Sequence, residues 1–140
     1  MAASGSRPEP AVTAAPRLSL DRITKRSGFL AAARDIRKVA GAITLEMTPT
    51  PEELARVGAL RIGFTASRKI GNAVARNRAK RRLRAAAQSL LPLSGRAGHD
   101  YVLVARAGIL TRDFQALLGA IAEAMRIAHQ KLDARSGAKA

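Results

Sequence analysis

The 140-residue chain has no cysteine and no tryptophan, and its aromatic side chains are limited to three phenylalanines and one tyrosine. Without cysteine there can be no disulfide, no thiolate zinc site and no cysteine nucleophile, a composition that suits a reducing cytoplasm. So few aromatics argue against an RNA reader built on a platform of stacked bases. No apolar run approaches the ~20 residues of a membrane span, and no secretory stretch is present. We therefore expect a cytoplasmic protein with no membrane partner.

Acidic residues are also scarce: 10 Asp and Glu stand against 25 Lys and Arg, which gives a formal net charge of +15. The acids are dispersed, and the sequence contains no carboxylate pair spaced for two metals, no Ser/His/Asp set and no phosphate-cradling glycine loop. His99 and His129 have no second ligand at metal spacing, so surface or capping roles are expected for both. The sequence thus predicts no catalytic residue and no metal site, but a polyanionic partner.

Basic residues concentrate in residues 61–84, which contain nine Lys or Arg and no Asp or Glu. Alternate positions from Leu60 to Ala66 are apolar, the pattern of a strand with one buried face. Asn72 then offers a helix N-cap, because its side-chain oxygen can accept from free backbone N–H groups. The helix is predicted from about Ala73 to about Leu91, ending near Pro92.

This helix has one narrow apolar stripe, and the rest of its surface is basic. The stripe consists of Ala75, Ala79, Leu83, Ala86 and Leu90. Arg76, Lys80 and Arg84 follow one another at i, i+4 spacing, which costs an isolated helix a few tenths of a kcal/mol per pair. A polyphosphate partner would offset that cost by releasing its condensed counterions. A solvated charged face is the usual explanation for mixed charges, but a face of a single sign favours RNA binding.

The residues of this segment also resemble a known family. The order Arg61-x-Gly63, Ser67-x-Lys69-x-Gly71-x-Ala73-Val74-x-Arg76-Asn77-Arg78-x-Lys80-Arg81-x-x-Arg84 is similar to the signature of the bacterial ribonuclease P protein subunit. A looser similarity runs from about residue 18 to about residue 132. The resemblance implies an endoribonuclease that works as a ribonucleoprotein, in which the catalytic RNA removes the 5′ leader of precursor tRNA. It further implies Mg²⁺ bound mainly by that RNA, and no stable protein partner.

The resemblance also assigns residues to two RNA sites. Contacts to the catalytic RNA are predicted for Arg68, Lys69, Arg76, Asn77, Arg78, Lys80, Arg81 and Arg84. The first helix is expected to form one wall of a leader cleft, whose predicted residues are Phe29, Arg61, Thr65 and Ser67. Ala33 replaces the aromatic residue that the family has one turn after Phe29. Glu46 would repel a leader phosphate there unless a cation bridges the two.

The remaining patterns predict two more strands. In residues 42–47 the apolar side chains point inward, and Thr44 and Glu46 point outward onto an open face. This strand is expected to pair antiparallel with the strand over residues 60–67. Residues 100–106 form a continuous apolar run, typical of a strand covered on both faces.

Two further helices are predicted. The first covers residues 27–34 with Ser27 as its candidate cap. The second opens at Thr111, with a cap and an acid in its first turn, and packs a continuous apolar stripe into the core. That stripe consists of Phe114, Leu117, Leu118, Ile121, Met125, Ala128 and Leu132. The domain should span residues 18–132, between a disordered tail over residues 1–17, which holds three prolines, and a frayed tail over residues 133–140.

Together these elements predict an α+β fold: a single two-layer domain with a mainly four-stranded sheet and helices packed on it, resembling the ribosomal protein S5 domain 2-like fold. Strand, helix, strand order implies a parallel crossover. Such crossovers are right-handed in nearly all proteins, whereas the resembled family is known for a left-handed one, and the sequence leaves the hand open. An alternative function also stays open, a non-enzymatic ribosomal or RNA-chaperone module that uses the same basic helix without a leader cleft.

Overall fold

The computed structural model describes residues 17–139, so the predicted tail over residues 1–17 lies outside the described part except for Arg17. The elements follow in the order β2 (Ser19–Arg22), α2 (Arg26–Ala33), β3 (Ile36–Ala40), β4 (Ile43–Pro49), η1 (Glu52–Leu54), β5 (Ala59–Thr65), η2 (Arg68–Ile70), α3 (Ala73–Ser94), β6 (His99–Ala105) and α4 (Phe114–Lys139). The mixed parallel and antiparallel sheet with helices packed on it confirms the predicted α+β class.

The sheet has five strands in the order β2-β5-β6-β4-β3, one more than predicted. Neither β2 nor β3 was among the strands located in the sequence; the four residues of β2 pair in parallel with Ala59–Ile62 at the edge of the sheet. The predicted antiparallel pairing of β4 with β5 is wrong, because β6 lies between them, antiparallel to β4 and parallel to β5. The apolar run of β6 explains its place: side chains buried on both faces need a central strand.

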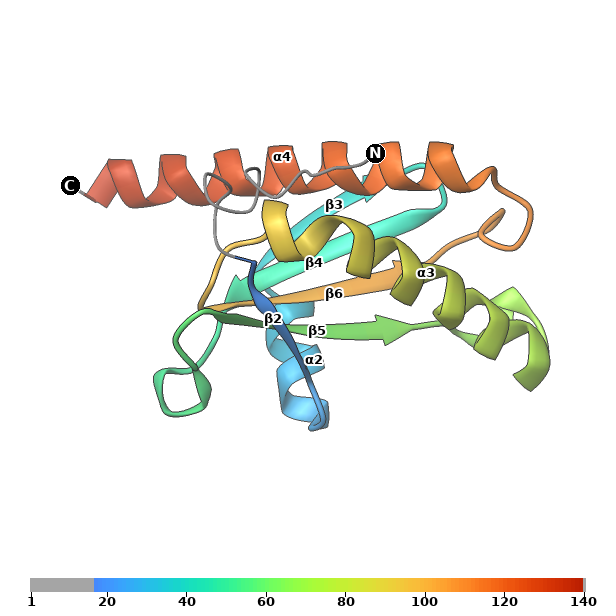
Figure 1. Ribbon diagram of the computed structural model, residues 1–140, viewed down its shortest axis with the longest axis horizontal. Helices are drawn as coiled ribbons and strands as arrows, with labels where there is room; N and C mark the ends of the chain where they lie inside the picture. Colours follow the sequence, from blue (N-terminus) through green and yellow to red (C-terminus); the bar gives the residue numbers. More distant parts are fainter. Residues whose placement is uncertain (1–16, 140) are drawn as a thin grey trace, which may run out of the picture.

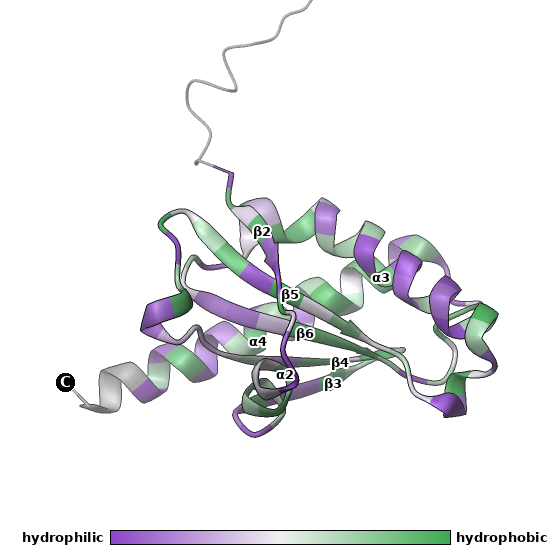
Figure 2. Ribbon diagram, turned by 90° about the horizontal axis from the view of Figure 1, so that it is seen from below, coloured by the Kyte–Doolittle hydropathy of each residue, from purple (hydrophilic) through white to green (hydrophobic). Residues whose placement is uncertain are grey.

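The connection from β5 through α3 to β6 joins two parallel neighbours, as predicted. In Figure 1 both strands point to the right, β6 lies above β5, and α3 returns to the left in front of the sheet. This path is left-handed, the opposite of the usual hand. It places the basic helix on the face of the sheet that α2 does not cover, as Figure 2 also shows.

Helices cover both faces of the sheet (Figures 1 and 2). The larger core joins α3 and α4 to the strands, with Leu83, Leu103 and Ile121 almost completely buried. A smaller core on the opposite face joins Ala32 of α2 to Val102. The face predicted to be open is therefore partly covered.

Thr44 and Glu46 point onto this second face, as predicted, but they are buried, with 1% and 6% of their surface exposed. Glu46 stands opposite Arg37 in the β3–β4 register, and the Arg37 Nε lies 3.2 Å from the carboxylate. The cation needed to offset this acid is thus supplied by the protein itself.

The ends of α2 and α4 differ from the predicted ones. Lys25, not Ser27, is the N-cap residue of α2, and its side chain makes no capping bond. Helix α4 begins at Phe114 because the side chain of Asp113, not Thr111, accepts from the backbone N–H of Ala116 at 3.1 Å. It continues to Lys139.

Helix α3 also outlasts its prediction, running through Pro92 to Ser94. Proline disfavours the helical conformation of the residue before it, but here tertiary contacts decide the outcome. Leu91 is 1% exposed, and the backbone N–H of Leu18 donates to the Pro92 carbonyl at 2.8 Å. Packing against β2 therefore fixes the last turn of the helix.

Candidate nucleic-acid interface

The orientation of α3 is set by its cap and its apolar stripe. The side chain of Asn72 accepts from the backbone N–H of Ala75 at 2.9 Å, which confirms the predicted cap. Ala79, Leu83 and Ala86 are completely buried. Since these residues face the sheet, the charged residues between them face solvent, and Figure 2 shows α3 coloured as hydrophilic along much of its length.

The positive charge of this helix is not neutralised within the described part of the chain. Six ion pairs occur among the described residues, and none includes a residue of α3. Residues 54–99 contain no Asp or Glu at all. The acids of the neighbouring elements are occupied elsewhere: Asp21 pairs with Arg56, and Asp100 pairs with Arg61. An external anion is therefore the partner that this face lacks.

The basic side chains of α3 are held to different degrees. Arg76 donates from Nη1 to the Gly71 carbonyl at 3.0 Å, and the Arg84 guanidinium lies 5.6 Å from the centroid of the Phe64 ring. Asn77, Arg78 and Arg81 are exposed. These residues and Lys80 complete the predicted contacts on α3.

Arg82 is different, because its side chain points toward the loop before α4. It donates to the carbonyl of Leu110 at 3.4 Å and to that of Arg112. Its Nε is buried and has no partner within the described residues. We interpret Arg82 as a link between α3 and α4, separate from the solvent-facing arginines.

The turn before α3 extends the basic face. Arg68 and Lys69 lie in the 3-10 turn η2, are exposed, and directly precede the helix. The Ser67 hydroxyl accepts from the backbone N–H of Lys69 at 3.3 Å, which closes this turn. All eight residues predicted to contact the catalytic RNA thus lie on one continuous stretch, η2 and α3, which we call the basic face.

The four predicted leader-cleft residues do not line one cleft. Phe29 packs on Gly63 so closely that a Cβ at that glycine would lie 2.5 Å from the ring. Arg61 forms a two-bond ion pair with Asp100, at 2.8 and 2.6 Å, and 14% of its side chain is exposed. The Asp100 bond raises the pKa of Arg61 further. Helix α2 and these contacts occupy the middle of the predicted cleft.

Two hollows remain near opposite ends of the strands on the α2 side. One, of about 300 Å³, contains Arg61 and Asp100 together with Ile23, Ser27 and Leu54 among its lining residues. The other, of about 360 Å³, combines polar and apolar lining residues and is called here the sheet groove. Its lining consists of Arg37, Thr44, Ser67, Lys69, Ile70, Val104, Ala105, Arg106 and Ala107.

Of the predicted cleft residues, Ser67 alone lies in the sheet groove, and Thr65 is half-buried at the end of β5. Three polar residues of the groove, Arg37, Thr44 and Arg106, were missed. Arg106 follows directly after β6, and its Nη1 lies 3.4 Å from the Thr44 hydroxyl. The signal available in the sequence was Arg106, a basic residue directly after an apolar strand. That signal indicates a groove residue only when the order of the strands is known.

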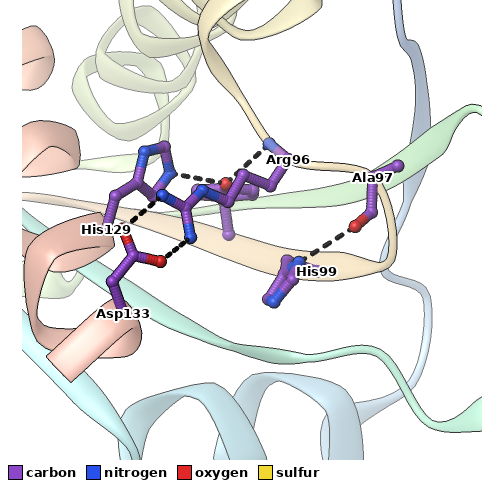
Figure 3. Close-up of polar contacts among 6 residues, drawn as sticks. Arg96, Ala97, His99, His129 and Asp133 are labelled. Atoms are coloured by element: carbon purple, nitrogen blue, oxygen red, sulfur yellow. Dashed lines mark hydrogen bonds and ion pairs between the residues drawn. The ribbon is translucent and has the colours of Figure 1, made fainter. Parts of the chain in front are cut away.

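The two histidines are part of structural contacts (Figure 3). His129 Nε2 lies 2.8 Å from the Tyr101 hydroxyl, which also accepts from the backbone N–H of Arg96 at 2.9 Å. Burial lowers the pKa of His129 to about 4 and raises that of Tyr101 to about 12. His99 Nδ1 lies 3.0 Å from the Ala97 carbonyl. No group of three potential metal ligands occurs in the described part of the chain.

The helices described here are all too short or too polar to cross a bilayer. The fold and the basic face together define a small α+β domain of the nucleic-acid-binding class. The family model Ribonuclease P matches residues 19–129 of the chain. The chain therefore belongs to the ribonuclease P protein component family, and the suspected resemblance is confirmed.

Individual relatives agree with this assignment. The Ribonuclease P protein component of Ruegeria pomeroyi is 44% identical over 121 residues, which cover 86% of this chain and 95% of the relative. That of Caulobacter vibrioides is 44% identical over 122 residues, covering 87% and 79%. Membership in this family associates the chain with tRNA processing, with RNA binding and with the ribonuclease P ribonucleoprotein.

Solved structures confirm the fold. The RNase P protein of Staphylococcus aureus superposes with a TM-score of 0.61 at 22% identity, covering 76% of this chain and 94% of that one. The RNase P protein from Thermotoga maritima gives a TM-score of 0.61 at 19% identity, with coverage of 75% and 94%.

Proposed function

We propose that this protein is the subunit of ribonuclease P that binds the catalytic RNA through the basic face and guides the 5′ leader of precursor tRNA along the sheet groove. The observation that carries the proposal is the uncompensated charge of α3, whose arginines have no acidic partner among the described residues. Phosphodiester hydrolysis and most Mg²⁺ binding are assigned to the RNA, and removal of the leader gives the mature tRNA 5′ end.

The catalytic RNA is bound through electrostatic attraction to its phosphates and through the fixed positions of the side chains on η2 and α3. Arg68, Lys69, Arg76, Arg78, Lys80, Arg81 and Arg84 contact phosphates, and Asn77 adds a directional hydrogen bond. Arginine suits this task because its planar fork can hold two phosphate oxygens. If about five to eight phosphates are neutralised, the logarithm of the affinity falls with the logarithm of salt concentration at a slope of roughly −4 to −7.

The sheet groove is the better candidate for the leader than the cleft predicted from the sequence. Arg106 and Lys69 supply positive charge, and the hydroxyls of Thr44 and Ser67 can bond to sugar or phosphate oxygens. The Arg37–Glu46 ion pair removes the repulsion that a bare Glu46 would cause. Phe29 faces Gly63 instead of the groove, so the leader is bound there without aromatic stacking.

Neutralising crowded phosphates also lowers the repulsion between catalytic RNA and precursor tRNA. Less Mg²⁺ is then needed to bring the two RNAs together. Cleavage with protein should saturate at a lower Mg²⁺ concentration than cleavage by the RNA alone, and identical Mg²⁺ midpoints would contradict the proposal.

Reconstitution with a bacterial ribonuclease P RNA tests the function directly. The full chain should restore cleavage of precursor tRNA at physiological Mg²⁺, and a precursor with a leader of one nucleotide should gain less than one with a long leader. An RNA-chaperone module would instead bind unrelated structured RNAs equally well and leave cleavage unstimulated.

A further inference from the structure

A small cavity lies at the end of the basic face, between α3 and the edge strand β2. Its volume is about 200 Å³, and its lining consists of Leu20, Arg22, Ile62, Phe64, Arg84, Ala87 and Gln88. Ile62 is 4% exposed and Ala87 is completely buried, so the floor is apolar. The upper walls are polar or cationic.

The cavity continues the line of cationic side chains on α3. Arg76, Lys80, Arg84 and Gln88 follow one another at i, i+4 spacing and therefore share one side of the helix. An RNA backbone that binds along this line meets Gln88 directly after Arg84, the last arginine of the line. The line thus ends at a hollow and not at a further charge.

An aromatic ring and a guanidinium form one wall of this hollow. Phe64 is half-buried, and the Arg84 guanidinium lies 5.6 Å from its ring centroid. Tyr101 is completely buried, Phe29 packs against Gly63 on the opposite face, and Phe114 begins α4 and does not line the cavity. Phe64 is therefore the aromatic residue placed to meet an RNA on α3. Nucleobases stack both on aromatic rings and on arginine guanidinium groups.

The remaining wall offers hydrogen bonds and charge but no acid. Gln88 is exposed, and its amide carries both a donor and an acceptor. Arg22 is also exposed, on β2. The adjacent carboxylate, Asp21, accepts two bonds from Arg56 at 2.8 Å and does not line the cavity. The Gln88 amide can hydrogen-bond to the edge of a base, and the Arg22 guanidinium can bind the phosphate of the same nucleotide.

We propose that this cavity binds a single unpaired base of the RNA held by α3. The inference rests on the proposed function and adds a base-reading site to its phosphate contacts. The base stacks on the Arg84–Phe64 pair, Gln88 hydrogen-bonds to its edge, and Arg22 contacts a flanking phosphate. A paired base is excluded because its edge and faces are already used within the duplex, whereas an unstacked base offers both.

The test is the affinity for a bacterial ribonuclease P RNA, measured over a range of salt concentrations. Gln88→Ala should weaken binding about tenfold with an unchanged salt slope, because it removes a base contact and no charge. Arg84→Ala should weaken binding and also make the slope shallower by about one. Ser89→Ala is the matched control: its hydroxyl bonds to the Ala85 carbonyl, outside the cavity, and its binding should stay within about twofold of wild type.

A second variant distinguishes hydrogen bonding to a base from electrostatic attraction to the RNA phosphates. Gln88→Lys adds a positive charge, so a purely electrostatic surface would bind RNA more tightly, whereas a base site loses the amide carbonyl that accepts from the base edge and binds more weakly. Tighter binding by Gln88→Lys, or equal binding by Gln88→Ala and Ser89→Ala, would overturn the inference.

A photocrosslinking residue at position 88 gives an independent readout in the assembled ribonucleoprotein. It should crosslink to one unpaired nucleotide of the RNA, and crosslinks spread over a duplex would overturn the inference. If wild-type protein binds this RNA with the expected salt slope while position 88 has no effect, the base site fails and the proposed function stands. If wild-type binding shows no salt dependence, both fail.

Discussion

The double substitution Arg76→Ala and Arg81→Ala is the most direct test of the basic face. Both side chains lie on α3, and neither takes part in an ion pair among the described residues. At about 0.15 M salt, each phosphate contact contributes roughly 0.7 to the logarithm of the binding constant through counterion release. Removing two contacts should therefore weaken RNA binding about 30-fold and make the salt slope shallower by about 1.8.

The same substitution should leave folding almost unchanged. The one intramolecular bond lost is that from Arg76 to the Gly71 carbonyl, which contributes at most about 1 kcal/mol. Alanine regains a few tenths of a kcal/mol through its helix propensity, and removing like charges regains a similar amount. The midpoint of thermal unfolding should thus stay within a few degrees of wild type.

Filter binding over a salt series and a thermal melt measure the two effects separately. The matched control is Arg126→Ala with Lys131→Ala, which removes two positive charges from exposed positions of α4. Equal RNA affinity of the two double variants would refute the reasoning, since net charge alone would then decide binding. A large loss of thermal stability in the α3 variant would show instead that these arginines hold the fold.

Three further substitutions test contacts that position the site. Asp100→Asn should cost about 3–5 kcal/mol in urea unfolding, because it leaves the largely buried Arg61 guanidinium without its counterion. His129 has its pKa lowered to about 4 from an unfolded value of 6.5, so stability should be fully present above pH 6.5 and should fall as the pH drops toward 4; His129→Gln should flatten that part of the profile. Gly63→Ala should cost about 1–3 kcal/mol, because the new methyl group would lie 2.5 Å from the Phe29 ring.

Each of these predictions has a control within the chain. Asp21→Asn breaks an exposed ion pair and should change stability little. His99→Gln is the control for the acid profile, because it removes the other histidine, whose ring contacts the Ala97 carbonyl and takes no part in the Tyr101–His129 contact. Gly119→Ala should stabilise the protein by up to about 1 kcal/mol, because a Cβ at this helical position meets no atom within 4 Å. Equal effects of the Gly63 and Gly119 changes would contradict the close packing of Phe29.

The basic face could be predicted because its determinants are local. Helical spacing fixes which side chains of α3 share a side, and Asn72 fixes where the helix begins, so the arginines needed no tertiary information. The end of α3 was misplaced for the opposite reason. Pro92 is unfavourable for a helix locally, and contacts with Leu18, distant in the sequence, hold the last turn.

The leader site depended on strand order, which period-2 patterns do not specify. Arg106 and Thr44 are 62 positions apart and become neighbours only because β6 pairs with β4. The alternating patterns led to the prediction that β5 pairs with β4. With that wrong pairing, the residues of the sheet groove are not neighbours, so the groove could not be predicted. Arg61 was misjudged similarly: its basic character was visible, but its neutralisation by Asp100 follows from the parallel register of β5 and β6.

The strand order has one last consequence, for synthesis of the chain on the ribosome. The central strand β6 is the last strand to be made, and it joins β2–β5 on one side to β3–β4 on the other. Until residue 105 has left the exit tunnel, the nascent polypeptide holds two separate strand pairs, each with an unsatisfied inner edge. A fragment that stops before His99 therefore cannot assemble the five-stranded sheet.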